Sequence, residues 1–216
     1  DMLDWDALND FRRKSLNPEH PAQRGTAQNP DVFFQAKEAS NKAYDAIPEV
    51  VEEYMNKVNE KIGSDYKLFN YYGAEDADEV IIAMGSVCDT ISETVDYLNA
   101  NGRKVGLVKV RLYRPFSVKH LVAAIPSTVK KISVLDRTKE PGSIGEPLYL
   151  DVVAALRDTE FANVPVYTGR YGLGSKDTTP AQIIAVFKNT EKKRFTIGIN
   201  DDVTNLSLAL DENPDT

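Results

Sequence analysis

The sequence has 216 residues, 42% of them hydrophobic and 27% charged, which is typical of a globular protein of one or two domains. Its longest apolar runs have five residues, as in Val80 to Met84, whereas a membrane span needs roughly 20, so no membrane partner is expected. A single cysteine excludes an internal disulfide and a cysteine-held iron–sulfur cluster. It also favours a cytoplasmic location. The chain begins at Asp1 without an initiator methionine, which suggests a piece of a longer protein.

The net charge of −7 is spread unevenly: residues 1–75 and 201–216 each carry −5, and residues 76–200 carry +3. We expect a helical linker or the end of a preceding domain at 1–75, and an α/β domain at 76–200. Residues 201–216 would form a tail or the start of a following domain. The small positive excess of the middle segment is too weak to predict a nucleic-acid partner.

The first segment shows helical spacing. Residues 4–15 place apolar side chains on one face, with Asp4 as the N-cap. A proline-containing connector over residues 17–30 precedes a second helix. Pro48 predicts a break in that helix, and a further amphipathic stripe ends at Gly63.

From residue 76 the pattern becomes that of an α/β protein. Short buried strands are expected at residues 80–84, 105–110, 132–135, 164–167 and 195–199, with helices between them. This alternation predicts a mostly parallel sheet with helices on both faces.

The stretch from Gly169 to Lys176 has two glycines at P-loop spacing. A P-loop requires Gly-Lys-Ser/Thr so that the lysine reaches the phosphates and the hydroxyl reaches magnesium. Here the serine precedes the lysine, and the next helix is expected only near Pro180. A tight strand-to-helix turn is therefore favoured over phosphate binding.

Other candidate sites have simpler explanations. Gly85-Ser86 joins a strand to a helix without a dinucleotide-binding fingerprint, so a compact turn is expected. Cys88, in the first turn of that helix, is expected to pack in the interior. His20 and His120 have no metal-ligand spacing, so no metal site is predicted.

The loop Asp136-Arg-Thr-Lys-Glu-Pro-Gly142 concentrates opposite charges just beyond a strand. The carboxyl ends of strands are where α/β sheets place their functional surfaces. The loop is either a solvated, salt-bridged turn or a docking surface for another domain.

These stretches carry a family resemblance. Glu79 to Ser86, Gly102, Val105 to Val110 and Leu112 to Phe116 resemble the C-terminal domain of transketolase-like, thiamine diphosphate-dependent enzymes. Leu135 to Gly142 and Gly145 to Leu150 resemble, within that superfamily, pyruvate:ferredoxin (flavodoxin) oxidoreductase. Arg24 to Asp31 with Phe33-Phe-Gln35, Gly169 to Leu173, and Phe195 to Ile199 with Asp201 to Thr204 agree with it.

The resemblance implies a longer, homodimeric parent enzyme that converts pyruvate and coenzyme A to acetyl-CoA and carbon dioxide. Its electrons would pass to ferredoxin or flavodoxin. It implies thiamine diphosphate, Mg²⁺ and iron–sulfur clusters for the parent. None is expected in this chain, because the family's Gly-Asp-Gly magnesium–diphosphate motif is absent and there is one cysteine.

We therefore expect no catalytic, cofactor-binding or metal-binding residue here, and an isolated chain without activity. The chain would be a structural domain that docks against other domains of the parent. The candidate docking residues lie in the motif loops: Arg24, Arg114, Arg137, Lys139, Glu140, Arg170, Tyr171 and Lys176.

Two alternatives remain open at this point. One is an autonomous α/β module that binds an anionic small molecule through Gly85-Ser86 and the Gly169 loop. The other is the C-terminal domain of a 2-oxo acid dehydrogenase β subunit, against which the loop at 136–142 argues.

Overall fold

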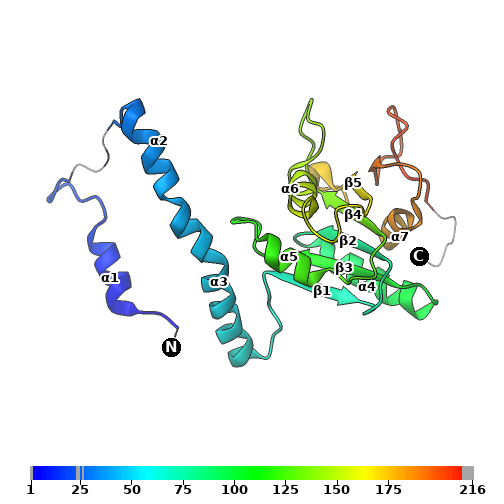
Figure 1. Ribbon diagram of the computed structural model, residues 1–216, viewed down its shortest axis with the longest axis horizontal. Helices are drawn as coiled ribbons and strands as arrows, with labels where there is room; N and C mark the ends of the chain where they lie inside the picture. Colours follow the sequence, from blue (N-terminus) through cyan, green and yellow to red (C-terminus); the bar gives the residue numbers. More distant parts are fainter. Residues whose placement is uncertain (1, 23–24, 26, 211–216) are drawn as a thin grey trace. The chain divides into compact units, whose positions relative to one another are not determined.

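The computed structural model of the chain describes residues 2–22, 25 and 27–210 (Figure 1). It consists of two compact units, Asp1–Lys42 and Ala43–Thr216, which are described separately here. The division falls earlier than the boundary expected after residue 75. The reason is that Val51 and Met55, in the helix α3 (Asn41–Ile62), pack against the core of the sheet.

The first unit is helical, as predicted. Helix α1 (Trp5–Arg13) is capped by Asp4, whose Oδ1 accepts a hydrogen bond from the Ala7 N–H at 2.9 Å, and α2 spans Pro30–Ala39. The expected break at Pro48 is wrong, because α3 continues through this proline. The chain leaves helical structure at Ser40 instead, and Pro48 is buried, so its packing offsets the missing N–H bond.

The second unit contains a six-stranded sheet in the order β1-β3-β2-β4-β5-β6. Five strands are parallel: β2 (Glu79–Ala83), β3 (Val105–Val110), β4 (Lys131–Asp136), β5 (Val166–Arg170) and β6 (Arg194–Thr196). The edge strand β1 (Phe69–Gly73) pairs antiparallel with β3. The sequence did not predict β1, which lies in the segment interpreted as a linker.

Helices cover both faces of this sheet, which confirms the predicted fold class (Figure 1). On one face α4 (Val87–Ala100) and α7 (Pro180–Lys188) enclose a core around Leu107 and Phe195. On the other, α5 (Val118–Ala124) and α6 (Pro147–Leu156) enclose a second core around Ile132 and Val134. No helix in the described part of the chain is long and apolar enough to cross a membrane.

Strand β5 begins and ends later than predicted and includes Gly169 and Arg170, which we had expected in a loop. A Cβ atom on Gly169 would lie 2.3 Å from Cε2 of Phe195 and 2.7 Å from Cδ2 of Leu135. Both neighbours are almost fully buried. The glycine is therefore required for the aromatic ring of β6 to pack on β5.

Asp136 joins the central strand β4 to the helix α6. Its side chain is 2% exposed, and its two carboxylate oxygens accept the N–H groups of Leu148 at 2.9 Å and Tyr149 at 3.1 Å. These donors belong to the first turn of α6, where backbone N–H groups lack helical partners. Burial raises the pKa of Asp136, and the two hydrogen bonds oppose that effect.

A methyl group at Gly169 is expected to destabilise the fold. We expect Gly169→Ala to lower the free energy of unfolding by about 1–3 kcal/mol, because the core around it has no space. Phe195→Leu removes the ring atoms nearest to that methyl group, so the double variant should lose less stability than the two single variants together. Denaturant unfolding of the four proteins measures this coupling, and strictly additive losses would contradict the explanation.

Asp136→Asn tests the junction between β4 and α6. The amide oxygen can accept one of the two N–H groups but its NH₂ group faces the other, so the free energy of unfolding should fall by about 1–3 kcal/mol. The exposed Asp158, changed to Asn, is the control and should alter stability by less than about 0.5 kcal/mol.

The same variant predicts a pH dependence. Because the pKa of Asp136 is raised in the folded state, its ionisation lowers stability as the pH rises from the ordinary value of 3.8 through the folded-state pKa. The stability difference between the native chain and Asp136→Asn should therefore narrow over that range in urea titrations at several pH values. A difference that widens would show that the folded state instead prefers the ionised carboxylate.

Candidate functional site

The loops at the carboxyl edge of the sheet are held by buried charged groups. Glu146, which precedes α6, accepts the backbone N–H of Glu140 at 2.7 Å through Oε2. Its Oε1 lies 3.4 Å from the Arg170 Nη1, at the end of β5. Both side chains are largely buried, so this ion pair connects the loop after β4 to the neighbouring strand.

Further bonds connect the loop after β4 to other loops. The Arg137 Nε donates to the carbonyl oxygen of Gly172 at 2.8 Å. Gly172 has φ +64°, a left-handed conformation that glycine adopts without strain. The guanidinium of Arg194 donates to the carbonyl oxygen of Ile144. The loops after β4 and β5 therefore form one connected surface.

Helix α6 also holds the loop that follows β3. Its Asp151 accepts the Tyr113 hydroxyl at 2.7 Å and the Arg114 Nη2 at 2.6 Å, both on the same carboxylate oxygen. The pKa of Tyr113 is raised to about 12, first by burial and then by the bond to Asp151. The guanidinium of Arg114 remains about half exposed, so it is available at the surface.

A cavity of about 300 Å³ lies beside the ends of β5 and β6. Its polar rim contains Lys139, Arg170 and Lys176, and its apolar lining includes Leu173 and Ile199. No carboxylate is among its lining residues, and neither lysine side chain has a partner among the described residues. The cavity therefore presents an apolar floor with unpaired positive charge at its rim.

The structure separates the eight predicted docking residues into groups. Exposed positions in the edge loops are occupied by Arg114, Arg137, Lys139, Glu140 and Lys176. The interpretation of Arg170 as a loop residue needs correction, because Arg170 ends β5. Tyr171 does lie in the loop after β5, but it is only 7% exposed and belongs to the core. Tyr171 packs in the core beneath α4 and α7, and Arg170 is paired with the buried Glu146. Arg24 lies outside the described residues.

The cavity nevertheless brings four of these predicted residues together, namely Lys139, Arg170, Tyr171 and Lys176. Arg114 and Arg137 do not line it. The prediction missed the carboxylates of Asp136, Glu146 and Asp151, which hold the loops in place. An acidic residue at the end of an apolar strand, and another directly before Pro147, were the available signals.

The glycine-containing stretch from Gly169 to Lys176 connects a strand to a helix. Lys176 follows a short 3₁₀ turn, η1 (Leu173–Ser175), and α7 begins four residues later at Pro180. The N-cap Thr179 exchanges hydrogen bonds with Gln182 in a capping box. This arrangement differs from a P-loop, in which the lysine opens the helix. Residues 171–179 connect β5 to α7, which is a longer connection than the predicted tight turn.

Cys88 packs in the core, as predicted. Burial raises the pKa of its thiol to about 11, so it is protonated at neutral pH and unreactive.

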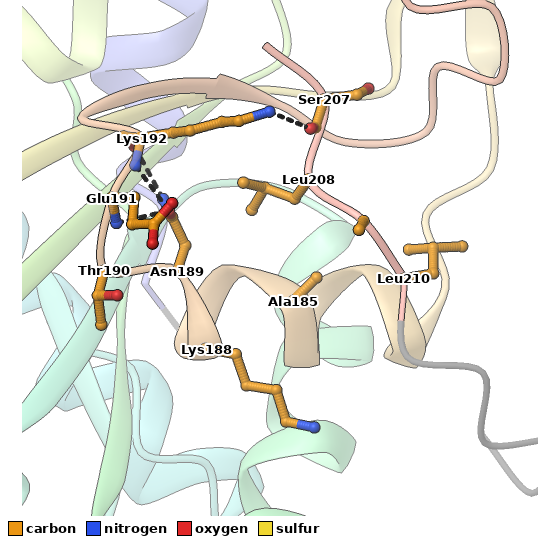
Figure 2. A pocket seen from close by; sticks show the side chains of 10 residues that line it. Ala185, Lys188, Asn189, Thr190, Glu191, Lys192, Ser207, Leu208 and Leu210 are labelled. Carbon is orange, nitrogen blue, oxygen red and sulfur yellow. Dashed lines mark hydrogen bonds between the residues drawn. The ribbon is translucent and has the colours of Figure 1, made fainter. Parts of the chain in front are cut away.

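The opposite, amino edge of the sheet is closed by its own contacts. Lys131 is buried there, donates to the carbonyl oxygens of Phe187 and Asn189 at 2.8 and 2.9 Å, and lies 2.7 Å from the Glu79 Oε2. A cavity of about 440 Å³ lies next to the end of α7 (Figure 2). Figure 2 shows the Lys192 Nζ bonded across it to the carbonyl oxygen of Ser207, at 2.7 Å. This edge is thus a structural junction.

No group of three or more His, Cys, Asp or Glu side chains that could hold a metal ion is present among the described residues. The carboxylates at the carboxyl edge are instead engaged with backbone N–H groups, arginines and a tyrosine. The arrangement can present charge to a neighbouring surface. At the start of α5, the Ser117 Oγ lies 2.7 Å from the His120 Nδ1, and the His120 Nε2 lies 3.5 Å from the Glu52 Oε2.

Comparison with known proteins identifies two family regions. The family model described as pyruvate:ferredoxin oxidoreductase core domain II matches residues 77–183. The family model described as pyruvate flavodoxin/ferredoxin oxidoreductase, thiamine diphosphate-binding, matches residues 2–56. Both regions contain sequence stretches that carry the family resemblance described above.

Individual proteins agree with these matches. A pyruvate-flavodoxin oxidoreductase of Enterobacter agglomerans is 58% identical over 215 residues, which cover 98% of this chain and 18% of that protein. A pyruvate:ferredoxin oxidoreductase of Moorella thermoacetica is 54% identical over 219 residues, covering 100% of this chain and 19% of that protein.

Among solved structures, a 2-oxoglutarate:ferredoxin oxidoreductase from Magnetococcus marinus is 25% identical with a TM-score of 0.42, covering 64% of this chain and 22% of that one. That similarity is too low to carry an argument. The sequence matches are sufficient on their own: the chain spans about 18–19% of the length of these two curated relatives, and it belongs to the pyruvate:ferredoxin (flavodoxin) oxidoreductase family.

Proposed function

We propose that residues 1–216 form a non-catalytic part of a larger pyruvate:ferredoxin or pyruvate:flavodoxin oxidoreductase, in which the carboxyl edge of the sheet docks against another domain. The names of the relatives support this parent activity. The parent would oxidatively decarboxylate pyruvate with coenzyme A to acetyl-CoA and carbon dioxide, and reduce ferredoxin or flavodoxin. We further propose a cytoplasmic homodimer.

The observation that carries the docking role is the contrast between buried and exposed charge at this edge. Asp136, Glu146 and Arg170 are buried and hold the loops. Lys139 and Lys176 project from those fixed loops without partners among the described residues. Positive groups on a rigid surface match a partner surface that carries carboxylates, and such complementarity fixes the orientation of the two surfaces.

Thiamine diphosphate and its magnesium ion are the cofactors that the family implies. Magnesium needs carboxylate or other oxygen ligands gathered at one point, and the described residues contain no such group of acidic side chains. The residues present therefore do not fit the magnesium–diphosphate group. We assign thiamine diphosphate, Mg²⁺, the iron–sulfur clusters and the coenzyme A site to the rest of the parent polypeptide.

A second candidate function is binding of an anionic small molecule by this chain itself. The cavity of about 300 Å³ with its lysine rim favours it, because its size falls at the lower end of ligand pockets. The other alternative, a 2-oxo acid dehydrogenase β subunit, is not the family to which the chain belongs.

The chain alone should show no pyruvate-dependent reduction of flavodoxin or ferredoxin, because its described part contains no group of side chains that could hold a metal ion. Calorimetric titration with coenzyme A, thiamine diphosphate and nucleotides should give no binding heat. Turnover would overturn the non-catalytic role, and heat from an anion would favour the second candidate.

Charge reversal in the full-length enzyme tests the docking role. Lys139→Glu combined with Lys176→Glu should lower turnover by about ten-fold, because like charges would then face an acidic partner surface. Lys130→Glu with Lys193→Glu is the matched control, since these exposed lysines lie at the amino edge. Steady-state reduction of flavodoxin by pyruvate and coenzyme A measures both, and equal activities would contradict the proposal.

A further inference from the structure

Helix α6 is apolar on two sides. Leu148, Val152 and the last residues of the helix point into the core below it. Leu150, Val153 and Ala154 are exposed, and with Arg157 they follow the spacing i, i+3, i+4, i+7, which places them on one outward stripe. A helix on the surface of a globular protein carries polar side chains on the face away from the core, whereas a helix that is apolar on all sides is buried. The outward stripe of α6 is therefore typical of a buried helix.

Asp151, the one charged residue within α6, does not lie on the outward stripe. Asp151 is occupied by the Tyr113 hydroxyl and the guanidinium of Arg114, at the loop that follows β3. Its role is therefore to hold that loop. On the outward stripe of α6 the side chains are apolar, and Arg157, just after the end of the helix, is the charged residue that continues it.

The stripe forms one wall of a groove of about 470 Å³. Phe161 and Val164, before β5, and Val166, its first residue, also line the groove. Leu150 and Val153 are 36% and 39% exposed, although both are large apolar side chains. Arg157 is the single charged residue in the lining, and it has no partner among the described residues.

We propose that this outer α6 groove holds an apolar segment of the same polypeptide from outside residues 1–216, with a carboxylate that pairs with Arg157. The chain spans only 18–19% of the length of two curated relatives, so about four fifths of such a polypeptide lies outside it. The lining gives the chemistry, since apolar walls exclude water and one unpaired guanidinium at the rim matches an acidic side chain. This proposal does not depend on the docking role of the carboxyl edge.

Site-specific photo-crosslinking in the full-length enzyme tests the occupant. A benzophenone amino acid replaces Val153 in one protein and Val118 of α5 in the other, because these valines are matched at 39% and 42% exposure. After irradiation, peptide mass spectrometry identifies the crosslinked segment and gel mobility shows whether one or two chains are joined. We expect Val153 to crosslink within one chain, to a peptide outside residues 1–216, with about ten-fold higher yield than Val118, as for a buried interface position.

Each other outcome would overturn the proposal. A crosslinked dimer would assign the groove to a second copy, and a crosslink within residues 1–216 would assign it to the chain itself. Equal yields from Val153 and Val118, or no crosslink from Val153, would show that the groove is open to solvent.

A second measurement does not rely on crosslinking. Arg157→Glu in the full-length enzyme should increase the rate of limited proteolysis about ten-fold, because it removes the charge pair and places like charges together at the interface. Arg157→Lys should restore most of the resistance, since it keeps the positive charge. Unchanged proteolysis of Arg157→Glu would contradict the predicted carboxylate partner.

Discussion

The carboxylate of Asp136 is the contact on which the carboxyl edge of this chain depends. It ends the central strand β4 and accepts the first free N–H groups of α6, so it fixes the start of that helix against the sheet. The loop between β4 and α6, residues 137–146, is held to β5 by the ion pair between Glu146 and Arg170. Burial of a carboxylate is costly unless its oxygens are hydrogen-bonded, and here both are. The loops are therefore rigid because a small set of buried polar groups is satisfied.

This arrangement gives the described part of the chain two surfaces that can contact a neighbouring domain. Fixed loops let Lys139 and Lys176 present charge at constant positions, and the second apolar stripe of α6 presents an unfilled groove. The amino edge behaves differently, because Lys131 is neutralised and hydrogen-bonded within the chain. The cavity beside β5 and β6 thus has unpaired lysine side chains at its rim, and the α6 groove has exposed apolar side chains. Contact with another part of the protein would pair the charges and cover the apolar surface.

The prediction of the site from sequence was partial for a specific reason. Loop motifs pointed to Lys139 and Lys176, which are exposed beside one cavity, because charged residues after a strand gather at the carboxyl edge of a parallel sheet. They also pointed to Tyr171, which is buried. A sequence motif does not predict which of its side chains will face the core. Asp136 and Glu146 were overlooked because their partners are backbone N–H groups and an arginine that are distant along the chain.

By itself, the sequence determined the α/β class, the five parallel strands, most helices and the family, because hydrophobic periodicity and local motifs are properties of short segments. Tertiary structure alone decided the antiparallel edge strand β1, the continuity of α3 through Pro48, and the inclusion of Gly169 in β5. Each of these depends on packing between segments far apart in the chain: β1 on its pairing with β3, Pro48 on its burial, and Gly169 on the ring of Phe195. Local propensity cannot predict such contacts, because the stabilising free energy of packing arises only when the second segment is in contact with the first.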